Sequence, residues 1–312
     1  MRIPKLSLSV ASVLLTLGAA PIGAQAGEYG FSSYGLGGNA FGAGATPPPG
    51  TYVTVVSGAY NGKIGANVQF DNVTINAGAN VEVFSSGLNV LYVPERKVFG
   101  GNLGLSITVP FGHVDMDATV SAGGPGVSRG VDGWGLGDII PKVQLGWQQG
   151  TFAHTAYVQA VTPTGRWDPG FSPIIGLHRP GVDVGWAFTW VDPQTKFQAN
   201  GALGFTFNFE NTETNYKSGT DFHWEWALGL ETSPGLVLGV VGYNYRQLTG
   251  DSGSGAVLGP FKGSVDAVGA GMSYTTLVGG TPFIFNLRHY REFNAENRWE
   301  GNMTIATGTV RF

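Results

Sequence analysis

Apolar and polar side chains alternate along most of this chain. The clearest example is residues 196–210, where Phe197, Phe205, Phe207 and Phe209 share one face. The opposite face of that segment carries mostly Gln, Asn, Ala, Gly and Thr. A period of two residues predicts β-strands, and it requires that the two faces of the sheet meet different surroundings.

The polar faces of these segments are unusually small and poor in charge. They consist mainly of Gly, Ala, Ser, Thr, Asn and Gln, whereas the apolar faces are rich in aromatic residues towards their ends. A soluble sheet would place many Lys and Glu on its hydrated face. Small polar residues on one face and aromatic residues on the other are typical of a transmembrane barrel, with lipid outside and a crowded lumen inside. We therefore predict an all-β fold, a transmembrane antiparallel outer-membrane β-barrel. The alternative is a soluble β-sandwich or jelly roll.

The spacing of the alternating segments predicts twelve strands, since outer-membrane barrels have an even number, with short periplasmic turns and longer outer loops. Tight connections at 94–99, 149–150, 192–194, 233–235 and 278–280 alternate with the connections at 61–78, 111–132, 164–177, 211–219, 249–261 and 294–298. This alternation places both ends of the barrel on the periplasmic side. The predicted strands are 51–60, 79–92, 100–110, 133–148, 151–163, 178–191, 195–210, 220–232, 236–248, 262–277, 281–293 and 299–312.

The beginning of the chain differs from the rest. Arg2 and Lys5 precede an apolar stretch at 6–20, and Ala24 and Ala26 form an A-x-A exit. This order predicts a secretory signal peptide over residues 1–26, cleaved after Ala26, with a membrane anchor as the alternative. Residues 27–50 are rich in Gly and Pro, and we interpret them as a tail that enters the lumen as a plug. Residues 51–312 are expected to form the barrel as one domain.

Composition excludes several other classes of protein. Glycine accounts for 51 of 312 residues, and each glycine in a helix interior costs about 1 kcal/mol relative to alanine, which disfavours a helical bundle. The 8 Trp, 11 Tyr and 19 Phe argue against disorder. The net charge of −4 and the lack of a basic run argue against nucleic-acid binding. There is no cysteine, so disulfides contribute nothing to stability.

One stretch resembles a known family. Residues 133–147 contain Gly-Asp-Ile at 137–139, followed by Pro141 and by Leu-Gly-Trp at 145–147, and the next strand ends in Val-Thr-Pro-Thr-Gly-Arg-Trp at 161–167. These motifs resemble the family named for the MetA pathway of phenol degradation, and the resemblance spans most of residues 50–312. It implies a predicted outer-membrane barrel of the kind called a transporter. It also implies passage of hydrophobic or aromatic molecules across the outer membrane.

Strand parity predicts which ionisable side chains face the lumen, where a charge avoids the cost of about 2–4 kcal/mol that it carries at the lipid midplane. These side chains either seal the lumen as a structural network or set selectivity around a permeant. Trp167 lies in a loop and is expected to contact an apolar permeant at the outer mouth. Most of the other tryptophans are expected in the interfacial belts. The predicted inward set is Asp138, Lys142, Asp183, His223, Glu225, Glu231, Arg246 and Arg288.

Motifs for catalysis or metal binding are not apparent in the sequence. The five His show no H-x-x-x-H or H-E-x-x-H spacing, and no G-x-S-x-G elbow is present. We therefore predict that the protein is not an enzyme and assign no catalytic residue, metal or cofactor. A barrel enzyme with Ser and His on adjacent strands remains a third possibility.

The C-terminal Phe312 resembles the signal read by the machinery that assembles barrels in the outer membrane. The match is imperfect, because Met303 and Ile305 fall on the opposite face from Phe312 and a bulge would be needed to reconcile them. The sequence thus predicts a passive channel for hydrophobic or aromatic small molecules in the outer membrane of a Gram-negative bacterium. The main alternative is a structural or adhesive barrel acting through its outer loops.

Overall fold

The computed structural model describes residues 26–70, 73–122, 126–167 and 175–312, and the predicted signal peptide lies almost entirely outside this range. The described chain is built from antiparallel strands, with one short 3₁₀ turn, η1 (Glu28–Gly30), near its start. The strands are β1 (Gly50–Phe70), β2 (Val73–Val93), β3 (Lys97–Val98), β4 (Gly101–Ala122), β5 (Val127–Leu136), β6 (Ile140–Gln149), β7 (Phe152–Val161), β8 (Gly181–Val191), β9 (Phe197–Asn208), β10 (Asp221–Ser233), β11 (Leu236–Gln247), β12 (Ser264–Val278), β13 (Thr281–Glu296) and β14 (Glu300–Arg311).

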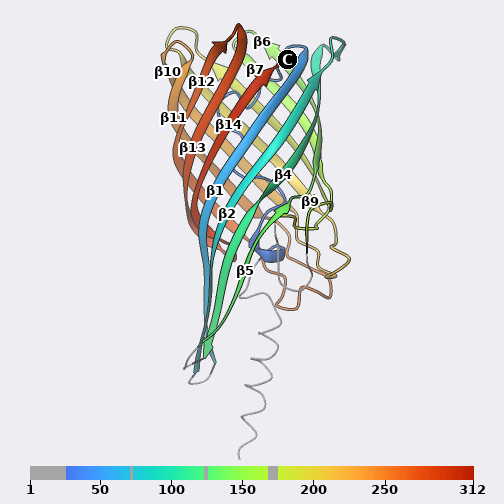
Figure 1. Cartoon of the computed structure of the whole chain (residues 1–312), viewed down its shortest axis with the longest axis vertical. Helices are drawn as coiled ribbons and strands as arrows, with labels where there is room; N and C mark the ends of the chain where they lie inside the picture. The colour runs from blue at the N-terminus through green and yellow to red at the C-terminus, as the bar shows by residue number, and fades with distance from the viewer. Residues whose placement is uncertain (1–25, 71–72, 123–125, 168–174) are drawn as a thin grey trace, which may run out of the picture.

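The sheet closes on itself as a barrel (Figure 1). From β6 to β14 each strand pairs with the next one in sequence, β1 pairs with both β2 and β14, and β2 pairs with β4. β3 is a two-residue pairing at the start of β4. β5 and β6 both pair with β4, β5 along 111–120 and β6 along 102–108, so together they form one wall strand that is interrupted at 137–139. The wall therefore has twelve strands, which confirms the predicted fold class and strand number.

The two faces of the wall differ as the alternation predicts. In β10 the inward side chains of His223 and Glu225 are almost completely buried, whereas the outward Leu228 and Leu230 are exposed. Apolar side chains are exposed over the outside of most wall strands, a surface far larger than a monomer leaves in water. This belt identifies the outside of the barrel as a lipid-facing surface. Its members include Val55, Leu88, Ile107, Val143, Val158, Val184, Phe205, Leu228, Leu238, Val240, Val268 and Leu287.

Two of the predicted outer loops are instead strands. β1 and β2 pair without a break from 50↔93 to 70↔73, and β4 pairs with β2 as far as Ala122, so the predicted loops 61–78 and 111–132 form hairpins that project beyond the barrel (Figure 1). The sequence signal was missed because outward side chains there, such as Lys63, Asp115 and Asp117, are polar. Beyond the lipid both faces of a hairpin are hydrated, so hydrogen bonding continues without apolar alternation.

The short connections and the C-terminus lie at one end of the barrel, and the projecting hairpins and longer loops at the other (Figure 1). Left-handed glycines make the tight turns, for example Gly150 at φ 60° and Gly235 at φ 78°. The N-terminal tail begins among the long loops and runs through the barrel to Gly50 at the short-turn end. The tail therefore crosses the lumen along its length, as the plug interpretation expects.

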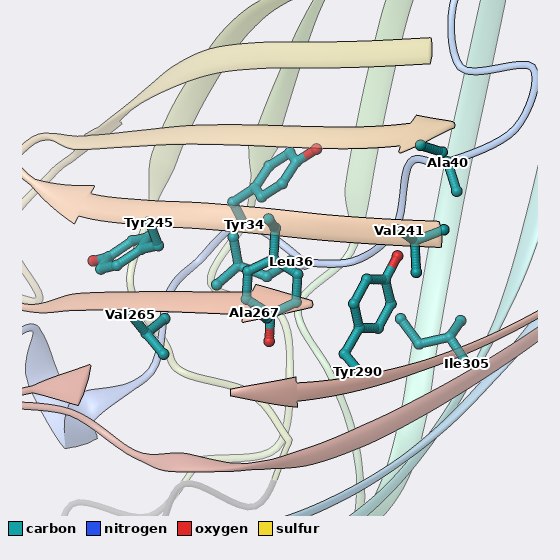
Figure 2. Packing of buried hydrophobic residues seen from close by; sticks show 11 residues of the cluster. Tyr34, Leu36, Ala40, Val241, Tyr245, Val265, Ala267, Tyr290 and Ile305 are labelled. Atoms are coloured by element: carbon teal, nitrogen blue, oxygen red, sulfur yellow. The ribbon is translucent and has the colours of Figure 1, made fainter. Parts of the chain in front are cut away.

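The largest buried hydrophobic cluster joins the tail to the wall. Tyr34, Leu36 and Ala40 of the tail pack with side chains from β11, β12, β13 and β14, as Figure 2 shows. Among these wall residues are Val241, Tyr245, Val265, Ala267, Tyr290 and Ile305. This part of the barrel interior is thus a packed core to which the tail contributes side chains.

Candidate functional site

The middle of the tail is held by charged side chains of the wall. The Glu225 carboxylate on β10 accepts hydrogen bonds from the backbone N–H of Gly37 at 3.0 Å and of Asn39 at 2.5 Å. On β13, Arg288 donates from Nη1 to the Gly38 carbonyl at 2.7 Å. An acidic and a basic side chain from two wall strands therefore bind three consecutive residues of the tail. Hydrogen bonds to charged groups are the stronger kind, contributing about 1.5–3 kcal/mol each.

Nearer the short turns, the tail approaches the wall backbone closely. Gly42 donates to Asn200 Oδ1 at 2.9 Å, and Gly44 donates to Thr189 Oγ1 at 3.0 Å. A Cβ at Gly44 would lie 2.4 Å from the Cα of Phe188, so any larger residue would push the tail away from β8. The glycines of the tail therefore serve close approach as well as flexibility.

Wall glycines make room for the tail in the same way. The Phe41 ring packs over two inward-facing glycines, Gly229 and Gly271. A Cβ added at Gly229 would lie 2.7 Å from this ring, and a Cβ added at Gly271 would lie 3.1 Å from it. These two residues belong to β10 and β12. Small inward residues thus shape the lumen to fit an aromatic side chain of the plug.

A buried acid–base pair lies beside the tail. His223 Nε2 is 2.8 Å from Asp183 Oδ2, and both side chains are fully buried. Thr206 donates to the same carboxylate oxygen at 2.7 Å. The ring of Tyr34 stacks on His223 with centroids 3.5 Å apart. The pair therefore supports the tail through an aromatic contact.

Lys142 lies in the same part of the lumen. Its Nζ lies 4.2 Å from the centre of the Tyr157 ring, a cation–π contact between β6 and β7. Three buried polar atoms close by have no hydrogen-bond partner among the described residues: Tyr157 Oη, Asp183 Oδ1 and His223 Nδ1. This region keeps unused capacity for hydrogen bonds.

The outer end of the tail is fixed by residues of the long loops. Arg179, almost fully buried, donates from Nη2 to the Phe31 carbonyl at 2.7 Å and from Nε to Ser33 Oγ at 2.8 Å. Glu28 accepts from Thr214 Oγ1 at 2.6 Å, and burial raises the pKa of its carboxyl. Arg179 was not among the predicted inward residues, although it falls within the predicted strand 178–191 and shares the parity of Asp183. In the structure it precedes β8, in the loop that leads into this strand.

Asp138 occupies the break between β5 and β6. Its carboxylate accepts backbone hydrogen bonds from Gly165 at 2.9 Å, Leu177 at 2.9 Å and His178 at 3.1 Å. Across the same break, Arg166 donates from its backbone N–H to the Leu136 carbonyl at 2.7 Å. The wall is therefore completed at this point by the β7–β8 loop, and Asp138 ties that loop to the barrel.

Removing the Asp138 carboxylate should loosen this closure. Asp138→Ala leaves three backbone N–H groups without their charged acceptor, and we expect a loss of about 3 kcal/mol or more in unfolding free energy. Urea unfolding of the refolded barrel measures the change. Asp192→Ala is the matched control, because Asp192 also accepts local hydrogen bonds but is only half-buried, in a short turn. Equal losses for the two variants would contradict this role for Asp138.

Arg246 does not point into the lumen, and the sequence-based prediction is wrong at this position. It pairs across the β10–β11 ladder with the outward Phe222 and forms an ion pair with Asp266 at 2.6 Å. The error follows from Tyr243 and Tyr245, which the pattern places outside as aromatic residues. Both face inward, because their hydroxyls donate to buried Glu292 and Asp221 at 2.7 Å.

The other predicted residues divide into two groups. Lys142, Asp183, His223, Glu225 and Arg288 come together around the tail. Glu231 is separate, accepting from Gly235 N–H at 3.0 Å at a short turn. Trp167 lies in the β7–β8 loop and stacks on His178 with centroids 4.7 Å apart. Contact of Trp167 with a permeant at the outer mouth stays a prediction.

Within the described ranges, no group of three or more His, Asp or Glu is arranged to hold a metal ion. The same residues include no helix long and apolar enough to cross a bilayer. The closed wall, its lipid-facing belt and the occupied lumen define a membrane-spanning β-barrel plugged by its own N-terminal segment. The chain belongs to the family described as "Putative MetA-pathway of phenol degradation", whose model matches residues 50–307.

The first of two solved structures supports this fold. The chain is similar to the COG4313 outer membrane channel from Pseudomonas putida F1, with 15% identity and a TM-score of 0.64 over 87% of this chain and 98% of that one. It also matches the CymD monoaromatic hydrocarbon channel, with 9% identity and a TM-score of 0.43 over 85% of this chain and 89% of that one. No curated protein matches the chain.

Proposed function

We propose that this protein is an outer-membrane channel for passive uptake of hydrophobic or aromatic small molecules. The observation that carries the proposal is the wall at 137–139, where a loop replaces strand pairing while the tail fills the lumen. A straight polar pore is therefore blocked. In this proposal an apolar molecule enters from the lipid side at the break in strand pairing, where only the β7–β8 loop completes the wall and where Trp134 and Leu136 are exposed on the outside. The family description, which refers to phenol degradation, supports an aromatic permeant.

This proposal includes the route to the membrane. Residues 1–26 would direct export and be removed after Ala26. Phe312 would present the C-terminal strand to the outer-membrane assembly machinery of a Gram-negative bacterium. In the structure Phe312 is 78% exposed at the end of the closing strand β14, and its N–H donates to the Thr51 carbonyl at 2.8 Å. An exposed terminal aromatic suits recognition by another protein.

We also infer that the protein acts without catalysis. Asp183, His223, Glu225 and Arg288 are engaged in gripping the tail or in a pair with each other, whereas Lys142 lies over the Tyr157 ring. In this scheme Lys142 and the Tyr157 hydroxyl contact the polar group of a passing aromatic molecule. Arg288 and Glu225 set how firmly the plug is held.

The proposal is tested by uptake of phenol into vesicles whose outer leaflet contains lipopolysaccharide, with a sugar of similar size as the polar solute. We expect the protein to speed phenol uptake and to leave sugar uptake near the background rate. Asp138→Ala and Arg288→Ala should change the phenol rate, and the outward Arg246→Ala is the control. Equal rates with and without protein for both solutes would overturn transport.

The adhesive alternative makes a different prediction in the same preparation. The β4–β5 hairpin projects beyond the barrel and is available to other surfaces (Figure 1). Shortening residues 111–132 would abolish adhesion while leaving phenol uptake unchanged. Loss of attachment to cells or surfaces in that variant, together with phenol rates at background in the unmodified protein, would favour the adhesive function.

A further inference from the structure

A buried carboxylate lies at the outer end of the tail. Asp251, in the loop between β11 and β12, is only 4% exposed. Its Oδ2 accepts hydrogen bonds from the Gly27 backbone N–H at 2.9 Å and from the Tyr216 hydroxyl at 2.6 Å. Its Oδ1 accepts from the Gly219 N–H at 3.1 Å and from Gln247 Nε2 at 2.7 Å. The carboxylate is thus fully surrounded by donors.

All four donors to Asp251 are neutral groups. Asp251 belongs to none of the ion pairs His113–Asp132, His223–Asp183 and Arg246–Asp266. Arg179, the nearby cation of the loop cluster, is directed instead to Ser33, Ser218 and the carbonyls of Glu28 and Phe31. Burying a carboxylate without an opposite charge is costly. The site is therefore complete in hydrogen bonds. Arg179 lies beside Gly27, where a Cβ would be 3.6 Å from its Nη1, but none of the hydrogen bonds that the Asp251 carboxylate accepts from the described residues comes from a cation.

Cleavage of the predicted signal peptide after Ala26 would place a positive charge on the Gly27 nitrogen, next to Asp251. Hydrolysis of the Ala26–Gly27 peptide bond consumes one water and leaves a carboxylate on Ala26 and an α-ammonium on Gly27. The nitrogen that becomes charged is the same Gly27 N that already donates to Asp251. We propose that Asp251 is the binding site for the α-ammonium group of the mature N-terminus, an inference that rests on the predicted cleavage after Ala26.

The neighbouring contacts fix the tail in one register at this site. The N–H of Glu28 donates to Ser218 Oγ at 3.1 Å, and the indole of Trp299 donates to the Tyr29 carbonyl at 2.9 Å. Gly27 itself has a φ of 69°, a conformation that favours glycine. A terminus one residue longer or shorter would place its amine away from Asp251. The site therefore distinguishes a terminus at Gly27 from other termini.

This binding site would couple maturation to closure of the lumen. The amide of an unprocessed chain donates one hydrogen bond without charge, whereas the ammonium donates up to three and neutralises Asp251. Charge-assisted hydrogen bonds are roughly twice as strong as neutral ones. Cleavage would thus strengthen the attachment of the tail at its outer end. Glu225 and Arg288 hold the tail further along, at its middle.

The experiment measures the reactivity of the terminal amine in full-length protein purified from outer membranes. Intact mass first identifies the mature terminus, expected at Gly27. The protein is then labelled at fixed pH with 2-pyridinecarboxaldehyde, which modifies N-terminal amines, and the modified fraction is followed by mass spectrometry. We expect Asp251→Asn to label about tenfold faster or more, since one unit of pKa changes the fraction of free amine tenfold.

Two further variants keep the result decisive. Glu213→Gln, at an exposed carboxylate in the β9–β10 loop, should label as slowly as the unmodified protein. A serine inserted between Ala26 and Gly27 moves the amine by one residue while keeping Asp251, and should label as fast as Asp251→Asn. A mature terminus at another residue, or equal labelling rates in the unmodified and serine-inserted proteins, would overturn the proposal. Neither outcome depends on what the channel transports.

Discussion

Deleting residues 31–46 should open the barrel to hydrophilic solutes. The tail fills the lumen with Tyr34, Leu36 and Phe41, so polar molecules can pass only through the minor fraction of barrels in which the tail has left. A minor state separated by a few kcal/mol is populated at about 0.1–10%, so removing the plug should raise the flux about 10- to 1000-fold. Swelling of proteoliposomes in sugar solutions measures it.

A point substitution separates loss of the plug from damage to the barrel. Glu225→Gln removes the negative charge that accepts hydrogen bonds from the N–H groups of Gly37 and Asn39. It also places the NH₂ group of the new side chain against one of these two N–H donors. We expect an increase in sugar flux in the same direction as the deletion, but smaller. Glu231→Gln is the matched control, because Glu231 also belongs to β10 but binds the turn at Gly235 and does not contact the tail. Unchanged flux in a deletion variant that still folds would contradict the plug.

The architecture could be predicted from sequence because the surroundings of the wall are simple. Lipid on one side imposes alternation on every spanning strand, as in residues 196–210, and the alternation yields both the strand number and the direction of most side chains. The prediction failed where that cause is absent. The hairpins at 61–78 and 111–132 leave the lipid, so their outward side chains are polar and only backbone pairing remains.

The interior could be predicted only in part, because the sequence pattern assumes a polar lumen. Asp183, His223, Glu225 and Arg288 were placed there correctly by parity. Tyr243 and Tyr245 were not, since an aromatic residue reads as lipid-facing until its buried hydrogen-bond partner is known. Likewise, Ile305 faces inward without a bulge, since the β1–β14 register is continuous and its partner is the tail cluster.

The detailed contacts of the site could not be read from the chain for a further reason. Glu225 meets Gly37 and Asn39, and Arg288 meets Gly38, across about two hundred residues of sequence or more. The tail has no periodicity of its own, so its sequence does not predict which tail residue contacts which position of the wall. Its glycines signalled a flexible segment, whereas several serve close contact, as Gly44 does against β8.

Breaking the Asp183–His223 pair should be far more damaging than breaking a similar pair on the surface. Asp183→Ala leaves His223 buried without its acceptor, and it also strands the Thr206 hydroxyl and weakens the support for Tyr34. Removing one partner of a buried ionic pair costs about 3–5 kcal/mol. His113 and Asp132 form the same kind of pair at 2.5 Å, but with 28% and 73% of their side chains exposed.

For that surface pair, Asp132→Ala should cost about 0–1 kcal/mol, because solvent screens the attraction and hydrates the group left behind. The two variants remove the same carboxylate from the same kind of histidine, so their difference isolates burial. Urea unfolding of both barrels, followed by tryptophan fluorescence, gives the two free energies. Equal losses of unfolding free energy in the two variants would show that the lumen around Asp183 is hydrated in solution. The tail would then not be packed against the wall at this point. A large loss at Asp183 alone would instead tie the stability of the wall to the contact between His223 and the tail.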